Sequence, residues 1–552
     1  MAAQKKQTLV FGALILMMSN LLVKFIGMFF RIPLTNMIGV EGMAYYNAAY
    51  SIYVSFYMIS TAGIPVAISR MIASSNSRKN TYEVAQIFKI AFNVFFDIGV
   101  VGTLIMILFS KQFARMSGMP DAYLAMIAIA PTLFFICLSS AYRGFFQGLQ
   151  NMVPSAVSQV IEAVGKIGIG LAAGWYFFKI KGEELPVVSA FVIFGVTIGV
   201  AAATLYAWIV RRRFISSEGY KKALAECKPT AVRSTKSLLV ELLITSLPIA
   251  LASSIMGLTN TVDTMVLARR LIESGIPEKA ATSYYGTYSS MVIPLFNMAP
   301  PLIYPFAIAA IPALSSAIAG GDAKGCKDNM ESAFRMGALI AIPCAIGMGT
   351  MSKGIINILF DTQMIDGVSS LDLAAPALTI VSSAIFFLAV ISITNSILQA
   401  YRFERQTIIS TVLGLLVKII ATWVISGIDG IGIIGSAIGT ALGYMTIMSL
   451  NIFFVITKTK FVPSIRKIFL KPLIAGVCCG GAALGLSKVL GEGKLNTIVC
   501  IGVAVIVYAA VIVLIRGINR ADIMMIPGGK MICKMMDKFG LLEKDTDVVK
   551  ES

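Results

Sequence analysis

Residues 186–210 read PVVSAFVIFGVTIGVAAATLYAWIV without a single charge, and three arginines follow at 211–213. A helix needs about 20 mostly apolar residues to cross the hydrocarbon core of a bilayer, so this stretch is long enough to span a membrane. Because Lys and Arg concentrate in the inner loops of membrane proteins, the arginines mark its cytoplasmic end. The stretch predicts a spanning α-helix, and the rest of the chain repeats its pattern.

The composition extends this prediction to all 552 residues. Apolar residues make up 57% of the chain and charged residues only 13%, whereas a soluble protein carries about 25% charged residues. The eighth apolar segment contains five prolines and is predicted to be one kinked helix, because neighbouring helices can satisfy the freed carbonyls. We predict an all-α polytopic membrane protein with 14 transmembrane helices at 8–38, 45–69, 84–110, 121–142, 154–178, 186–210, 238–268, 282–316, 332–357, 372–399, 406–428, 432–456, 468–487 and 495–515.

The distribution of basic residues predicts the orientation. With the N-terminus inside, and with Lys353 and Lys471 near span ends counted with the adjoining loops, 30 of the 46 Lys and Arg residues lie on the inner side, 10 in outer loops and 6 within spans. Both termini are therefore predicted to be cytoplasmic, in a multi-pass protein of the cell membrane. The net charge of +18 follows from the same asymmetry, and segment 211–236 is its most basic part. This charge faces the anionic inner leaflet, so no nucleic-acid partner is needed to explain it.

Two internal matches predict a repeat. A shift of 252 places 147–167 on 399–419, and a shift of 240 places 65–75 on 305–315, at equivalent spans. Because each repeat holds an even number of spans, both have the same orientation and are related by an axis along the membrane normal. The predicted organisation is an N-lobe at 1–211, a basic cytoplasmic linker at 212–237, a C-lobe at 238–457, two additional spans at 458–516 and a cytoplasmic tail at 517–552.

Charged residues inside the predicted spans are the candidate functional residues. Each costs at least about 2.5–3.5 kcal/mol near the middle of the bilayer, so each needs a reason to be there. A cationic lining would suit an anionic head group, since phosphate oxygens accept charge-assisted hydrogen bonds from Arg and Lys. The candidates are Lys24, Arg31, Arg70, Glu162, Lys166 and Lys418 for substrate binding and Asp263 for ion coupling.

Each candidate also has an alternative interpretation. Glu162 and Lys166 stand at i,i+4 in the favourable order and could neutralise each other. Arg70, at the cytoplasmic end of the second span, could be an interfacial anchor. Glycines at four-residue spacing, as in 435–443, are interpreted as close-packing positions between helices.

Several absences exclude catalytic classes. The chain has no histidine, which excludes His-based zinc sites and Ser-His-Asp triads. The eight cysteines form no C-x-x-C pair, and no P-loop is present. No loop is long enough for a catalytic domain, which argues against a membrane glycosyltransferase. We predict that the protein is not an enzyme and has no cofactor or metal.

Three stretches carry a resemblance to a known family. They are VKFIGMFFRIPLTNMIG (23–39), the run YVSFYMISTAGIPVAIS (53–69) and YRGFFQGLQNMVPSAVSQVIE (142–162). The sequence resembles the polysaccharide-transport branch of the multidrug/oligosaccharidyl-lipid/polysaccharide (MOP) exporter superfamily. It is most similar to the group of stage V sporulation protein B and its Gram-positive relatives, which includes lipid II flippases. The resemblance covers about residues 8–516.

The resemblance implies an alternating-access transporter that moves a polyprenyl-pyrophosphate-linked saccharide across the cytoplasmic membrane. Lys24 and Arg31 correspond to helix-1 arginines of the lipid II branch, and Asp263 corresponds to a sodium-binding aspartate in helix 7. The branch's sodium ligands in helix 11 would fall near Gly414 and Lys418, and a lysine cannot bind sodium. We therefore predict that Asp263 pairs with Lys418 in at least one state. Sodium, protons and membrane potential stay open as driving forces.

The predicted function is a flippase for an undecaprenyl-pyrophosphate-linked glycan, with lipid II as the first candidate, in cell-wall or spore-cortex synthesis. We expect a monomer in the bilayer. One alternative is a cation-coupled multidrug exporter of the same superfamily, which would need an acidic central cavity. The other is a non-transporting scaffold of a glycan-synthesis complex, in which neutralising the buried cations would have little effect.

Overall fold

The computed structural model describes residues 9–61, 64–227, 233–464, 466–491, 493–515 and 517. The chain forms two compact units, Met1–Ser290 and Met291–Ser552. Helices make up nearly all of the described residues, and the strands among them form one short antiparallel hairpin, β1 (Met364–Ile365) with β2 (Val368–Ser369). The two units are described separately below.

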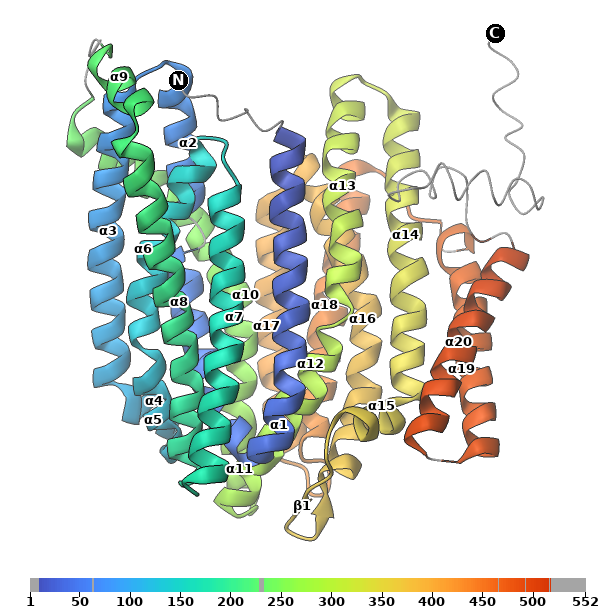
Figure 1. Ribbon diagram of the computed structural model, residues 1–552. Helices are drawn as coiled ribbons and strands as arrows, with labels where there is room; N and C mark the ends of the chain where they lie inside the picture. The colour runs from blue at the N-terminus through green and yellow to red at the C-terminus, as the bar shows by residue number, and fades with distance from the viewer. Residues whose placement is uncertain are drawn as a thin grey trace. The chain divides into compact units, whose positions relative to one another are not determined.

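Unit 1 contains the first half of the helices. Figure 1 shows α3, α6, α8 and α7 of this unit, in blue to green, and neighbouring members of this series pack against one another. Its elements are α1 (Leu9–Thr61), α2 (Ile64–Ser77), α3 (Thr81–Leu108), α4 (Ser110–Met116), η1 (Pro120–Ala122), α5 (Tyr123–Ile129), α6 (Pro131–Gly148), α7 (Val153–Gly174), η2 (Trp175–Ile180), α8 (Leu185–Ser216), α9 (Glu218–Ala225), α10 (Thr235–Glu273), α11 (Glu278–Thr287) and the start of η3 (Tyr288–Val292).

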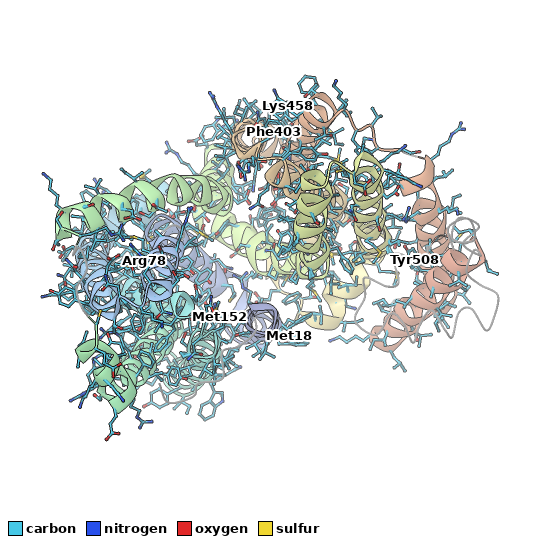
Figure 2. The ribbon with its side chains drawn as sticks, turned by 90° about the horizontal axis from the view of Figure 1, so that it is seen from above. Met18, Arg78, Met152, Phe403, Lys458 and Tyr508 are labelled. Atoms are coloured by element: carbon cyan, nitrogen blue, oxygen red, sulfur yellow. The ribbon has the colours of Figure 1, made fainter. Side chains whose placement is uncertain are left out.

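Unit 2 contains the remaining helices. Within it, α16 packs against α13, α14 and α18, α17 against α18, and α19 against α14 and α20. In Figure 2, Phe403 and Lys458 lie side by side, with the Lys458 nitrogen 5.7 Å from the ring centre. The elements are α12 (Ile293–Phe296), α13 (Pro300–Ala319), α14 (Ala323–Thr350), α15 (Ser352–Leu359), the hairpin, α16 (Ser370–Ala400), α17 (Glu404–Ser426), α18 (Ile434–Thr459), η4 (Arg466–Leu470), α19 (Lys471–Leu490) and α20 (Lys494–Leu514).

Eleven helices among the described residues are long and apolar enough to cross a membrane. They include the predicted spans 3 to 6 and 9 to 14, with bounds that differ by up to nine residues. Predicted spans 1 and 2 fall mainly in the 53-residue α1, and span 7 falls in the 39-residue α10. The protein is a multi-pass membrane protein, and the count of fourteen and the two-lobe arrangement stay predictions.

The eighth predicted span is not one kinked helix. The segment 282–316 is divided into α11, the π-helical η3, the four-residue α12 and α13. Non-helical residues 297–299 separate α12 from α13. Pro294 and Pro300 each stand at the first turn of a helix, where the missing N–H costs no hydrogen bond. The prolines therefore begin new helices here.

Gly39 divides α1 into two helical halves. Its φ of 73° lies in the left-handed region, which glycine adopts without strain. The break falls in the interval predicted to separate spans 1 and 2. Next to it, Gly286 of α11 packs directly on the Val40 carbonyl, where an added methyl group would overlap the oxygen. The close approach of α11 to α1 therefore depends on glycine.

We expect Gly286→Ala to destabilise unit 1 by about 1–3 kcal/mol, because overpacking a close backbone contact forces the helices apart. Thermal unfolding of the purified protein in detergent measures the effect as a lowered Tm. Gly168→Ala is the matched control, since a methyl group at that helical position meets no atom within 4 Å. Equal Tm values for the two variants would contradict the proposed packing role.

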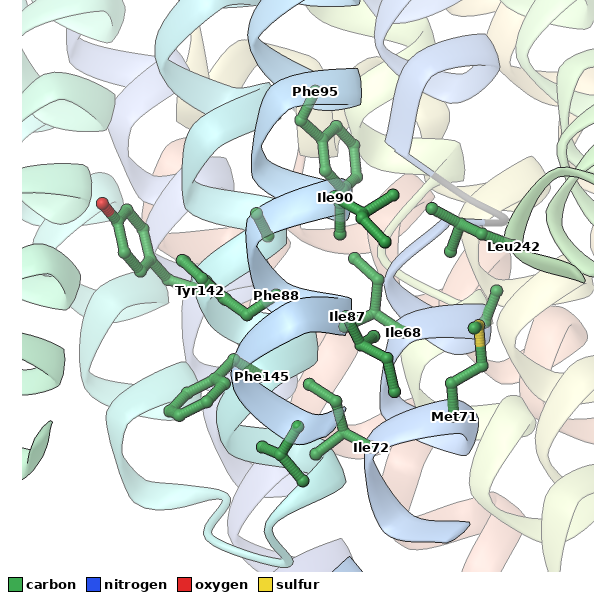
Figure 3. Packing of buried hydrophobic residues seen from close by; sticks show 14 of the residues in the cluster. Ile68, Met71, Ile72, Ile87, Phe88, Ile90, Phe95, Tyr142, Phe145 and Leu242 are labelled. Atoms are coloured by element: carbon green, nitrogen blue, oxygen red, sulfur yellow. The ribbon is translucent and has the colours of Figure 1, made fainter. Parts of the chain in front are cut away.

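The core of unit 1 lies between α2, α3 and α6. Figure 3 shows Ile68, Ile72 and Ile87 packed together beside the Phe88 and Phe145 rings. These rings meet edge to face with centroids 5.3 Å apart, a favourable geometry for aromatic pairs. This cluster fixes the positions of the helices from which the charged residues of the unit extend.

A buried acid closes the turn between α2 and α3. Glu83 accepts hydrogen bonds from the Ser75 hydroxyl at 2.7 Å, from Arg78 at 3.1 Å and from the Arg233 Nε at 3.2 Å. Its backbone N–H donates to the Asn80 side chain, which caps α3. Arg233 belongs to the basic linker that precedes α10. The end of the linker is therefore fixed on this turn.

Candidate functional site

The second half of α1 carries Tyr46, Tyr50, Tyr53 and Tyr57 at a spacing that places them on one helix face. Consecutive ring centroids are 6.0, 5.8 and 6.0 Å apart. Tyr46 and Tyr53 are buried, whereas Tyr50 and Tyr57 are partly exposed. We call this continuous aromatic face the tyrosine ladder.

Two predicted cations lie near the tyrosine ladder. The Lys166 nitrogen of α7 is 4.4 Å from the centre of the Tyr50 ring and 5.8 Å from that of Phe30. Arg31, half-buried in the first half of α1, is near enough to act electrostatically on Tyr46 and Tyr50. A ring face attracts a cation without removing its charge. The ladder therefore supports positive charge in this part of unit 1.

Glu162 pairs with an arginine that is not among the predicted site residues. Its Oε2 accepts a hydrogen bond of 2.8 Å from the Nη2 of Arg143, on α6. The Arg143 Nε donates to the Ser158 hydroxyl at 2.9 Å, and Ser158 in turn donates to the Ser155 carbonyl at 2.7 Å. The Arg143 side chain is 11% exposed and that of Glu162 30%. The acid is thus the more accessible member of the pair.

The alternative in which Glu162 neutralises Lys166 is wrong for this structure. Within the described part of unit 1, the ion pair of Glu162 is formed with Arg143, and Lys166 lies over the Tyr50 ring. The i,i+4 spacing permits a pair but does not exclude a better partner on a neighbouring helix. Because Arg143 and Glu162 cancel, the positive charge of Lys166 has no local acid assigned to it.

The sequence contains a feature from which Arg143 could have been identified as a site residue. It lies in the YRGFFQG motif, between the predicted end of span 4 at 142 and the start of span 5. The helix α6 continues to Gly148, so Arg143 remains inside a helix that faces α7. If predicted span 4 had been extended by one helical turn, Arg143 would have counted as a charge within a span and as a possible partner of Glu162.

Asp263 is buried on α10, close in sequence to two threonines whose hydroxyls form hydrogen bonds. Two residues before Asp263 on the same helix, the Thr261 hydroxyl forms hydrogen bonds with the hydroxyls of Ser51 and Ser55 of α1. The hydroxyl of the next residue, Thr264, lies 2.8 Å from the hydroxyl of Tyr285. Asp263 acts electrostatically on the same tyrosine. Asp263 itself is 7% exposed and has a polar or electrostatic partner. A buried carboxylate of this kind can bind a proton or a monovalent cation.

The described residues contain no group of three His, Cys, Asp or Glu side chains that could hold a metal ion. A single acid such as Asp263 suits a weakly held ion such as sodium better than a divalent metal. Such an ion would be a transported or coupling ion.

The other predicted residues are placed differently. The side chain of Lys24 lies outside the described side chains. Arg70 is exposed on α2, and no ion pair within 4.0 Å involves it among the described residues. Lys418 is buried on α17 of unit 2, at 4% exposure, and has a polar or electrostatic partner. Asp263 and Lys418 belong to different units, so their predicted ion pair stays a prediction.

Both predicted lysines of the repeat lie on closely packed helix pairs. In unit 1, a methyl group at Gly199 of α8 would lie 2.9 Å from the backbone nitrogen of Lys166. In unit 2, a methyl group at Gly443 of α18 would lie 2.9 Å from the Cβ of Lys418. Small residues allow such approach between membrane helices. The interpretation of glycines 435–443 as packing positions is confirmed by these contacts.

Comparison with known proteins gives one matching family. The family model described as polysaccharide biosynthesis protein matches residues 9–318. Stage V sporulation protein B of Bacillus subtilis (strain 168) is 25% identical over 532 residues, which cover 95% of this chain and 98% of that protein. The lipid II flippase MurJ of the same organism is 24% identical over 445 residues, covering 79% of this chain and 80% of the relative.

Solved structures share the fold. The lipid II flippase MurJ in an inward closed conformation aligns with a TM-score of 0.66 at 14% identity, covering 90% of this chain and 98% of that one. A multidrug resistance MATE family transporter of the MOP superfamily, in an inward-facing conformation, aligns with a TM-score of 0.62 at 14% identity, covering 80% and 94%. At this identity the likeness concerns the fold alone.

Proposed function

The chain belongs to the polysaccharide biosynthesis protein family, and we propose that it is a flippase for an undecaprenyl-pyrophosphate-linked glycan, with lipid II as the first candidate. The observation that carries the proposal is Lys166, a cation inside the helix bundle that lies on an aromatic face while the nearby acid is bound to Arg143. Lys166 is half-buried, and a cation within a spanning helix is costly in a membrane when no acid neutralises it. An anionic substrate would offset that cost.

The substrate class follows from charge and shape. A pyrophosphate presents several oxygens that accept charge-assisted hydrogen bonds from Lys and Arg. The glycan presents ring faces and hydroxyls, for which the tyrosine ladder beside Lys166 offers apolar faces and phenolic groups. The relative named as a lipid II flippase supports the same class of substrate.

We infer that transport proceeds by alternating access between two pseudo-symmetric lobes. The close α7–α8 and α17–α18 pairs, each with a lysine at a glycine contact, support the repeat predicted from the shift of 252. The excess of basic residues in the predicted inner loops supports cytoplasmic termini. Loading of the lipid would then occur from the cytoplasmic side.

The multidrug exporter is the second candidate, because MATE transporters share the fold. It would require an acidic environment for cationic drugs. In unit 1, Glu162 is bound to Arg143 and Asp263 is buried, whereas Lys166 and Arg31 are near the tyrosine ladder. This charge balance favours an anionic substrate over a cationic drug.

Complementation tests the proposed function directly. The gene is expressed in cells depleted of their lipid II flippase, and growth and outward flipping of lipid II are measured. We expect rescue of both. Rescue would also exclude the scaffold alternative, because a non-transporting subunit cannot replace the flippase. Absence of rescue, together with export of cationic dyes, would instead support the exporter.

A further inference from the structure

We propose that Arg143 is a further binding residue for the substrate pyrophosphate, and that the Glu162 carboxylate occupies its guanidinium between transport cycles. The inference rests on the proposed function and deepens it, since it names how one cation of the site is held and released. The site residues predicted from the sequence do not include Arg143.

The first argument is the geometry of the guanidinium. Arg143 uses Nε for Ser158, at 2.9 Å, and Nη2 for Glu162, at 2.8 Å. Ser158 is fully buried and is itself fixed by its bond to the Ser155 carbonyl. The guanidinium is therefore oriented without the help of Glu162. Its planar fork matches phosphate oxygens as well as it matches a carboxylate.

The second argument is the difference in accessibility within the pair. The Glu162 side chain is 30% exposed and that of Arg143 only 11%. A partly exposed carboxylate can leave for water, whereas the less exposed guanidinium needs another anion in its place. Glu162 also has Lys166 one turn further along α7, in the favourable i,i+4 order. The acid is thus the displaceable partner.

The third argument comes from the equivalent positions of unit 2. The shift of 252 places Arg143 on Asn395, Ser158 on Ser410 and Glu162 on Gly414. There Ser410 donates to Asn451, and Asn451 donates to Asn395 at 2.7 Å, in a network without charge.

Neutral hydrogen bonds therefore suffice to join the helices at this position. The ion pair of Arg143 and Glu162 is not needed for packing, so its charges call for another role. Binding of an anion by the arginine, in competition with the acid, provides that role.

The inference predicts how substrate binds and leaves. A pyrophosphate oxygen displaces Glu162 from Arg143 when the lipid enters, and Glu162 returns when the lipid leaves. The returning carboxylate competes with the phosphate and so favours release. Removing the acid should therefore tighten binding and slow turnover, which is the opposite of what loss of a substrate-binding residue does.

The test is a double-mutant cycle on the full-length protein in nanodiscs, with undecaprenyl pyrophosphate as the probe and uncharged undecaprenol as the blank. We expect Glu162→Gln to bind the probe about 3–10-fold more tightly and Arg143→Ala about 10-fold more weakly, in line with the strength of charge-assisted hydrogen bonds. In the Arg143→Ala background, Glu162→Gln should change affinity less than about 2-fold, because the competition requires the arginine.

Asp97→Asn is the matched control, since it removes one exposed acid of the same unit and should leave affinity unchanged. If Arg143→Ala fails to fold, the neutral pair Arg143→Gln with Glu162→Gln, which imitates the network of unit 2, takes its place in the cycle. Flipping at saturating lipid provides the second measurement, and Glu162→Gln should be slower than the unmodified protein.

The inference is overturned if Glu162→Gln binds the probe no more tightly, or if the same gain appears without Arg143. In the first case the ion pair would have only a structural role. In the second case Glu162 would act on the bound anion by long-range electrostatic repulsion and not by competing for Arg143. These outcomes differ from failure of the proposed function, in which the unmodified protein would bind no undecaprenyl pyrophosphate and would not rescue flippase-depleted cells.

Discussion

Arg31→Ala, and separately Lys24→Ala, should abolish rescue of flippase-depleted cells while membrane levels of the protein stay normal. Each substitution removes a cation that pairs with phosphate, and a charge-assisted hydrogen bond is worth about 1.5–3 kcal/mol. This corresponds to roughly 10- to 150-fold weaker binding of the lipid head group. Growth on depletion and immunoblots of the membrane fraction are the measurements.

Arg213→Ala is the control for this pair, because Arg213 is exposed at the end of α8 and should be dispensable. The same assay separates binding from folding, since a misfolded variant would be lost from the membrane. Full rescue by both Arg31→Ala and Lys24→Ala would show that the cations of helix α1 do not bind the substrate.

The second large effect concerns the driving force. We predict that flipping depends on membrane potential more than on a sodium gradient, with Asp263 paired to Lys418 in at least one state. Moving one charge through 100 mV is worth about 2.3 kcal/mol, which is enough to bias a two-state cycle. An inside-negative potential favours outward movement of an anionic head group. Flipping in vesicles with an imposed potassium diffusion potential, and with sodium replaced by choline, measures this dependence.

Activity in choline should remain and should fall when the potential is collapsed. Asp263→Asn should slow flipping in both media, because its loss leaves Lys418 without the predicted partner. Loss of activity in choline that sodium alone restores would show that the prediction is wrong. That result would instead assign Asp263 to the binding of a sodium ion.

The helical membrane architecture could be predicted because its cause is local. Long apolar segments have to satisfy their own backbone hydrogen bonds in lipid, so each forms a helix. The resemblance carried by residues 23–39, 53–69 and 142–162 is confirmed by the family match and by the relatives. The division of 282–316 into separate helices was not predictable from hydropathy, which does not distinguish a kinked helix from a broken one.

The candidate site could be predicted only in part. Arg31, Glu162, Lys166 and Asp263 are identifiable because charge is rare within apolar spans. The partner of Glu162 was not, because Arg143 is 19 residues away on another helix and spacing along one helix cannot indicate contacts across two. The hydroxyls close to Asp263 in sequence carry no such signal, since Ser and Thr are common in membrane helices.

The acid that closes the α2–α3 turn has a consequence for biosynthesis. Glu83 precedes Arg233, one of its two arginine partners, by 150 residues. At about 5–20 residues per second, a ribosome needs roughly 8–30 s to add that length. During this interval Arg78, five residues before Glu83, is the one of its two arginine partners that has already been made. The hydrogen bonds of the turn are therefore completed only after the linker has been synthesised. The assembly of unit 1 thus follows the order of translation.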